Sequence, residues 1–115
     1  MLKVLKYHLL SGTKKIGFFE MTEDKKNCRI TLNKDLNWID IPFDFEVKYK
    51  QGIFVYETIE VMNWIKSRVV HYTRQNINSI LAYHNLDEYN EMDLFLVNNG
   101  RFCDDDFSIS LIEGK

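Results

Sequence analysis

The stretch of sequence that decides the fold begins with TIEVMNWIKSRVV at residues 58–70 and continues to residue 112. The hydrophobic side chains of its first part recur at helical spacing and are Ile59, Met62, Ile65 and Val69, with Trp64 beside them. This spacing predicts an amphipathic helix that turns those side chains toward the core.

A second short helix is predicted to follow almost directly. Thr73 is placed to cap it, because a threonine hydroxyl can accept a hydrogen bond from a backbone N–H of the first turn. The side chains that recur along it are Ile77, Ile80, Leu81 and His84. Asn85 tolerates the left-handed conformation that ends a helix, and Leu86 is the expected hydrophobic contact just beyond it.

A third helix is predicted to begin at Asp87 and to end at Asn98-Asn99-Gly100, residues that accept a positive φ. Its inward side chains are expected to be Tyr89, Met92, Phe95 and Leu96. After this helix, Phe107, Ile109 and Leu111 alternate with two serines. The alternation predicts a closing strand over residues 106–112.

The first half of the chain reads mainly as strands. Residues 2–10 and 14–21 flank a Ser-Gly-Thr turn, and residues 28–32 alternate again, which predicts an antiparallel meander. Residues 43–49 alternate well enough for a short edge strand, and Pro42, the only proline, is expected to prevent a helix there. Phe54 and Tyr56 either continue the sheet or pack beneath the first long helix.

These elements predict one α+β domain over residues 1–115, with strands in residues 1–56, three short helices in 57–99 that cover an antiparallel sheet, and a closing strand at 106–112. The chain has no apolar run long enough to cross a bilayer, and its first residues do not resemble a signal peptide. Cys28 and Cys103 lie far apart without metal-ligand spacing. We therefore expect a cytoplasmic protein that binds no membrane and no cofactor.

Charge is divided unevenly along the chain. Residues 1–50 hold ten Lys or Arg and seven Asp or Glu, residues 51–115 hold five and ten, and the net charge is −2. The acids of the second half gather around the third helix and the turn after it: Asp87, Glu88, Glu91, Asp93, Asp104, Asp105 and Asp106. Because phosphate binding relies on Lys and Arg, this surface is not expected to bind nucleic acid directly. It is expected to bind a basic protein surface.

Two arginines add a second candidate contact. Arg68 and Arg74 flank the turn that contains Tyr72, where their guanidinium groups could hold a carboxylate or phosphate of a partner. Alternatively, one of them pairs inside the domain with Glu60, Asp104 or Asp106. The predicted partner-binding residues are Asp87, Glu88, Glu91, Asp93, Asp104, Asp105, Arg68, Tyr72 and Arg74.

Other chemistries find less support in the sequence. Three adjacent aspartates at 104–106 cannot all converge on one cation, and the glycine and distal glutamate of a calcium loop are missing. A small hydrolase or nuclease would use His71 or His84 with the aspartates, or Cys103 as nucleophile, but no spacing ties these residues together. The helix-turn-helix reading of residues 58–85 has only Arg74 as a basic residue in its second helix.

A family resemblance adds to this reading. WIKSRVV at 64–70, RQNI at 74–77, the LF pair at 94–95, GR at 100–101 and DDF at 105–107 resemble the small amino-terminal module of HipA-like toxin kinases. The family usually has a proline where Val70 or His71 stands. Since the kinase core is absent, the resemblance implies a separate antitoxin-like subunit that binds and restrains a kinase. A phage inhibitor of a bacterial defence enzyme, of anti-CRISPR type, is the alternative, and both are binders without catalytic residues.

Overall fold

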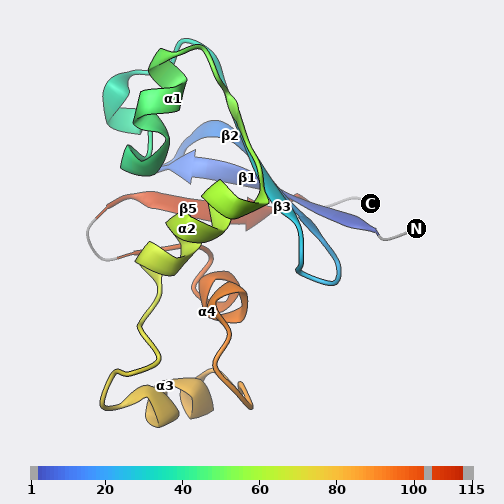
Figure 1. Cartoon of the computed structure of the whole chain (residues 1–115), viewed down its shortest axis with the longest axis vertical. Helices are drawn as coiled ribbons and strands as arrows, with labels where there is room; N and C mark the ends of the chain where they lie inside the picture. The colour runs from blue at the N-terminus through green and yellow to red at the C-terminus, as the bar shows by residue number, and fades with distance from the viewer. Residues whose placement is uncertain (1–2, 103–104, 113–115) are drawn as a thin grey trace.

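A five-stranded antiparallel sheet forms one layer of the protein (Figure 1). The computed structural model describes residues 3–102 and 105–112. The strands lie in the order β4-β3-β2-β1-β5, and every neighbouring pair is antiparallel. They are β1 (Val4–Ser11), β2 (Lys14–Thr22), β3 (Cys28–Leu32), β4 (Val55–Tyr56) and β5 (Phe107–Leu111). The predicted meander and the closing strand are both present.

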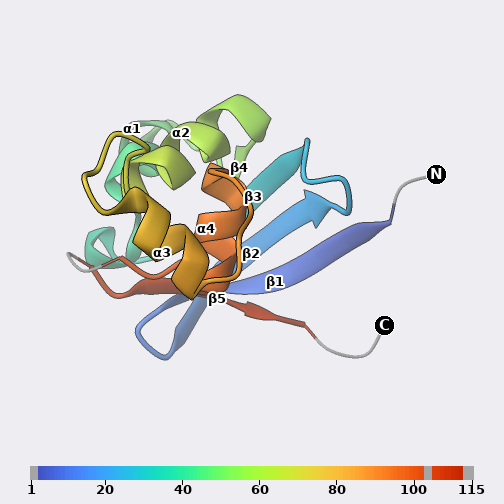
Figure 2. The ribbon, with the colours of Figure 1, turned by 90° about the horizontal axis from the view of Figure 1, so that it is seen from below.

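The helices all lie on one side of this sheet (Figure 2). They are α1 (Glu46–Lys50), α2 (Thr58–Arg68), α3 (Ile77–Tyr83) and α4 (Glu91–Val97), and two short 3-10 helices, η1 (Trp38–Asp40) and η2 (Phe43–Phe45), precede α1. The predicted α+β class is therefore confirmed. No helix in the described part of the chain is long and apolar enough to cross a membrane.

The core lies between the sheet and the pair α2 and α4. Phe95 of α4 meets Phe19 of β2 and Trp64 of α2, with ring centroids 5.5 and 5.7 Å apart. Leu9 and Ile30 are fully buried in the same cluster. Aromatic pairs at this separation add to the stabilisation from burial of apolar area. The predicted inward position of Phe95 is confirmed.

The predicted edge strand at residues 43–49 is wrong, because this segment forms η2 and α1. Pro42 stands just before the helical segment. A proline is tolerated at a helix start, because the backbone N–H that it lacks would have no hydrogen-bond partner within the helix there. Phe45 stacks on Tyr56 with centroids 4.4 Å apart, and the Tyr49 hydroxyl donates to the Asn33 carbonyl at 2.7 Å. These contacts with distant residues stabilise the helical turn. β4 (Val55–Tyr56) takes the edge position instead.

The predicted inward face of α2 is only partly right. Its buried residues are Val61, Trp64, Ile65 and Arg68, whereas Ile59 is 78% exposed. Thr58 explains this orientation, because its hydroxyl bonds both the N–H and the carbonyl of Cys28 in β3, each at 3.2 Å. The first turn of α2 is thereby fixed to the sheet with Ile59 on the solvent side.

Two helix starts also differ from the predicted ones. The Thr73 hydroxyl lies 2.7 Å from His71 Nδ1, and α3 begins only at Ile77. α4 begins at Glu91, and the side chain of Asn90 accepts a hydrogen bond from the Asp93 N–H at 3.0 Å. Asn90 is thus the N-cap in place of Asp87, since a short amide side chain suits this position. The helix ends are as predicted: Asn85, Asn99 and Gly100 all have positive φ.

Candidate protein-binding surface

Arg68 is an internal residue, only 6% exposed. Its guanidinium donates to both carboxylate oxygens of Asp105 at 2.6 and 2.8 Å. It also donates to the carbonyl of Gly100 at 2.9 and 3.1 Å and to that of Phe107 at 3.2 Å. Of the two alternatives for Arg68, this geometry favours pairing inside the domain, with Asp105 in place of Glu60, Asp104 or Asp106.

Two of the predicted partner-binding acids are engaged within the chain. Asp105 holds Arg68 and accepts a hydrogen bond from the Phe107 N–H at 3.0 Å. The carboxylate of Asp93 lies 2.6 Å from Lys25 Nζ. The carboxylates of Asp93 and Asp105 are therefore already neutralised by cations of the same chain. Asp104 and Cys103 lie outside the described residues, and Asp106 is exposed.

The remaining predicted acids lie around α3 and the start of α4. Asp87 and Glu88 are exposed in the connection before α4, and Glu91 is half-buried in its first turn. Within residues 3–102 and 105–112, none of these three carboxylates has an ion-pair partner. These three carboxylates remain available to an external cation.

Exposed tyrosines accompany these acids. Tyr72 is 61% exposed, meets Tyr89 edge-on at 5.9 Å and lies 4.6 Å from the ring of His71. The Tyr89 hydroxyl donates to the carbonyl of Val70 at 2.8 Å, and burial raises the pKa of that hydroxyl. This hydrogen bond joins the two connections of α3. Tyr83 on α3 is 83% exposed, and no pattern in the sequence indicates this exposure.

We call residues 70–91 the α3 lobe. It lies at the foot of the molecule, joined to α2 and α4 by extended connections (Figure 1). Leu81 of the lobe and Leu94 of α4 are buried, and both stand outside the main core cluster. Arg74 is exposed within it, and its Nε donates to the Asn76 side chain at 3.0 Å.

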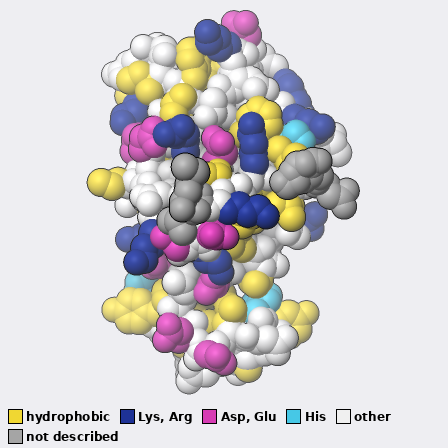
Figure 3. All heavy atoms as spheres, turned by 90° about the vertical axis from the view of Figure 1, so that its right-hand side faces the viewer, with side chains coloured by type: hydrophobic (Ala, Val, Ile, Leu, Met, Phe, Trp, Pro, Cys, Tyr) yellow, Lys and Arg dark blue, Asp and Glu magenta, His cyan; other side chains and the backbone are white. Residues whose placement is uncertain are grey.

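The charge distribution agrees with an acidic lower end of the molecule. Figure 3, which looks at the right-hand side of Figure 1, shows acidic and hydrophobic side chains around the lower end. Lys and Arg side chains lie mainly in its middle and upper parts. Acidic side chains are present in the middle and upper parts too. The lower end differs from them because few Lys or Arg side chains accompany its acids.

A second exposed surface was not predicted from the sequence. Trp38, Ile39, Phe43 and Val47 are 67–84% exposed, and all four come from η1, η2 and α1. We call these four residues the apolar patch. Phe43 and Val47 are four residues apart, which is the spacing of one helical face. Residues four apart also lie on one face of a strand, and the sequence prediction placed a strand over residues 43–49.

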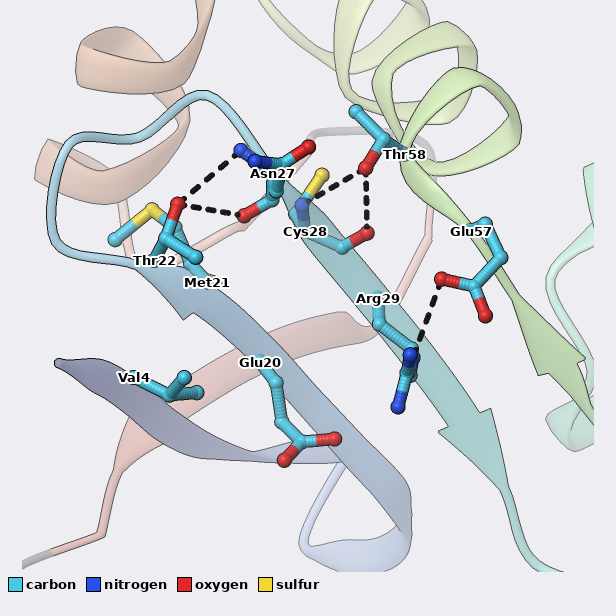
Figure 4. Close-up of a pocket in the computed structure, with 9 residues that line it drawn as sticks. All are labelled: Val4, Glu20, Met21, Thr22, Asn27, Cys28, Arg29, Glu57 and Thr58. Atoms are coloured by element: carbon cyan, nitrogen blue, oxygen red, sulfur yellow. Dashed lines mark hydrogen bonds and ion pairs between the residues drawn. The ribbon is translucent and has the colours of Figure 1, made fainter. Parts of the chain in front are cut away.

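The pocket shown in Figure 4 has a volume of about 340 Å³ and lies beside β2, β3 and the start of α2. Arg29 and Glu57 lie at one side of it and form an ion pair, with Nε and Oε1 3.2 Å apart. Burial raises the pKa of the Cys28 thiol to about 11, so this thiol is protonated at neutral pH. A neutral thiol is a poor nucleophile, so Cys28 is not an activated nucleophile in this pocket.

The residues of the enzyme alternative are not brought together in the described part of the chain. The side chain of His71 contacts Thr73 and Tyr72, and the ring of His84 lies against Tyr83 at 5.0 Å. No group of three or more His, Cys, Asp or Glu in residues 3–102 and 105–112 is arranged to hold a metal ion.

The chain was also compared with known proteins. No protein-family model, no curated protein and no solved structure matches it.

Proposed function

We propose that this chain is a non-enzymatic binding module that attaches to a basic surface of a larger protein through the α3 lobe and restrains that protein. The observation that carries the proposal is the exposure of Tyr72 and Tyr83 in the same lobe as Asp87, Glu88 and Glu91. These three acids have no ion-pair partner within the described residues.

Tyrosine and carboxylate side chains together suit a surface rich in Arg and Lys. A tyrosine ring attracts a guanidinium or ammonium group over its face, and two rings that are already packed, like Tyr72 and Tyr89, lose little freedom on binding. The exposed carboxylates increase the rate of encounter with a positive surface. The lobe therefore provides both steering charges and aromatic contact area.

The class of partner follows from the same chemistry. The resemblance of residues 64–107 to the small module of HipA-like kinases supports such a kinase as the partner. A nucleic-acid-binding defence enzyme also carries a basic surface, and an acidic lobe on that surface would compete with nucleic acid. An activity assay distinguishes these two partners. Binding of this chain would reduce phosphoryl transfer by a kinase, whereas it would displace nucleic acid from a defence enzyme.

The test begins with the partner that co-purifies from native cells and then uses both purified proteins. Association and dissociation rates are measured over a range of salt for wild type, Tyr83→Ala and the double variant Asp87→Lys with Glu88→Lys. We expect the double variant to associate about tenfold more slowly at low salt and with less salt dependence. Tyr83→Ala should mainly increase the dissociation rate.

Glu23→Lys is the matched control, because Glu23 is exposed in the turn between β2 and β3, outside the lobe. It should leave both rates close to those of wild type. Equal rates for wild type and both lobe variants at every salt concentration would contradict the proposal.

A further inference from the structure

The α3 lobe takes no part in the main core. The structure describes all of residues 70–91, and Leu81 is the only buried residue among them. The residues of the core cluster, and the half-buried side chains that pack against it, all lie outside this range. A segment that buries little apolar surface has a low free energy of local opening, because few contacts are lost when it detaches.

The hydrogen bonds of the lobe are internal as well. In the described ranges 3–102 and 105–112, no hydrogen bond or ion pair joins residues 71–88 to the sheet, α1, α2 or α4. The N–H groups of Asn85 and Leu86 donate to the carbonyls of Ala82 and Leu81 at 3.1 and 2.8 Å and close the end of α3. The lobe is thus ordered by its own bonds.

The helix of the lobe is too short to be stable by itself. α3 has seven residues, and helices shorter than about 12 residues are marginal in water without tertiary contacts. Its N-cap residue, Asn76, makes no capping hydrogen bond. The side-chain oxygen of Asn76 instead accepts a hydrogen bond from Arg74 Nε at 3.0 Å. α3 therefore depends on the contacts that keep the lobe closed.

Tyr89 closes the base of the lobe. Its hydroxyl donates to the Val70 carbonyl at 2.8 Å, and its ring meets that of Tyr72 edge-on at 5.9 Å. Val70 follows α2 and Tyr89 precedes α4, so this hydrogen bond joins the two connections through which the lobe leaves the rest of the molecule (Figure 1). We call the hydrogen bond between Tyr89 and Val70 the clasp.

The residues on either side of the clasp are fixed outside the lobe. Arg68, two residues before Val70, donates hydrogen bonds to Gly100 and Asp105. Asn90, which follows Tyr89, caps α4 by accepting a hydrogen bond from its third residue, at 3.0 Å. An opening that begins at the clasp therefore stops at these two residues, and α2, α4 and the sheet keep their contacts.

We propose that the α3 lobe opens and closes as one unit while the rest of the fold stays intact, and that the hydrogen bond between Tyr89 and Val70 holds it closed. Closing orders the segment that carries the exposed tyrosines and acids of the proposed binding surface. The partner then binds the closed lobe only, a consequence that rests on the proposed function. Partner and clasp favour the same state of the lobe.

Amide hydrogen–deuterium exchange of the free protein, followed by NMR, tests the clasp. The amides of His84, Asn85 and Leu86 report on α3, because their hydrogen bonds lie inside the lobe, and the amides of β2 report on the core. In wild type the three α3 amides should be protected, but at least about a hundredfold less than those of β2. Tyr89→Phe removes only the hydroxyl. It should lower the protection of the α3 amides roughly threefold to tenfold and leave that of β2 unchanged.

Tyr56→Phe is the matched control, because it also removes a hydroxyl that donates to a carbonyl, that of Ile53 at 2.7 Å, but outside the lobe. It should leave the protection of the α3 amides at the wild-type level. Three results would overturn the proposal. They are equal protection of α3 and β2 in wild type, unchanged α3 protection in Tyr89→Phe, and an equal loss of α3 protection in both variants.

Exchange in the presence of the partner tests binding to the closed lobe. Partner at about a hundred times its Kd should raise the protection of the α3 amides about a hundredfold, because the lobe then opens only after the partner leaves. If the double variant Asp87→Lys with Glu88→Lys slows association but bound partner leaves α3 protection unchanged, binding to the closed lobe is wrong and the proposed function stands. If the double variant associates like wild type, the proposed function fails, and exchange of the free protein still decides the clasp.

Discussion

Arg68 at the end of α2 holds Asp105 through two parallel hydrogen bonds, 2.6 and 2.8 Å long, across a sequence separation of 37 residues. The same guanidinium lies 4.6 Å above the Trp64 ring and bonds the Gly100 carbonyl. One buried side chain thus connects α2, the end of α4 and the segment that enters β5.

Arg68→Met is predicted to destabilise the fold by roughly 3–5 kcal/mol, because it leaves the carbonyl of Gly100 and the carboxylate of Asp105 without their donor. Urea denaturation monitored by tryptophan fluorescence measures the change. Arg74→Met is the control, and it should change the unfolding free energy by less than about 0.5 kcal/mol, because Arg74 is exposed. Equal stabilities of the two variants would show that the Arg68 network contributes nothing.

Phe95→Ala is predicted to cost roughly 3–5 kcal/mol, because Phe95 is 1% exposed and packs against Phe19 and Trp64. Thermal unfolding followed by circular dichroism provides the measurement. Val97→Ala is the matched change on the outer side of α4, where Val97 is 40% exposed. An unchanged melting temperature of Phe95→Ala would place α4 in a different orientation.

Gly17→Ala is predicted to destabilise the protein by roughly 1–3 kcal/mol. The reason is close packing in β2, since a Cβ added at Gly17 would overlap the carbonyl oxygen of Thr31 in β3. Gly12→Ala serves as the comparison, because nothing lies within 4 Å of its added Cβ. Gly12 has a φ of 63°, so its variant reports backbone strain alone. A Gly17→Ala protein as stable as wild type would disprove the close approach of β2 and β3.

Cys28 is predicted to contribute a pH dependence at the alkaline end. Burial raises the pKa of its thiol to about 11, above the value in the unfolded chain. The stabilisation that keeps the thiol neutral is therefore complete below the unfolded pKa and is lost as pH rises toward about 11.

Urea unfolding at about pH 8 and about pH 10 measures this effect. The two proteins compared are Cys28→Ala and its parent, and both carry Cys103→Ser. The parent should lose more stability between the two pH values than Cys28→Ala. The same loss in both proteins would assign the pH dependence to other groups, among them Tyr56, whose pKa burial raises to about 12.

The candidate binding surface could be predicted only in part. The sequence placed Asp87, Glu88 and Glu91 in one acidic region, because neighbours in the chain stay neighbours in a short lobe, and it assigned Tyr72 to a separate contact with Arg68 and Arg74. It also assigned Asp93 and Asp105 to the acidic region, although Lys25 and Arg68 hold them. The ion pairs Lys25–Asp93 and Arg68–Asp105 join residues that are 68 and 37 positions apart, so no local sequence pattern indicates them.

Alternating hydrophobic residues and turn residues were enough to specify β1, β2, β3 and β5, the α+β class and the helix ends at Asn85 and Gly100, because these features depend on local backbone preferences. Contacts between distant residues decided the rest. Phe45 stacks on Tyr56 and helps keep residues 43–50 helical, and Thr58 binds Cys28 and thereby turns Ile59 to solvent. In both places the local pattern allowed two structures, and packing against a residue far along the chain stabilised one of them.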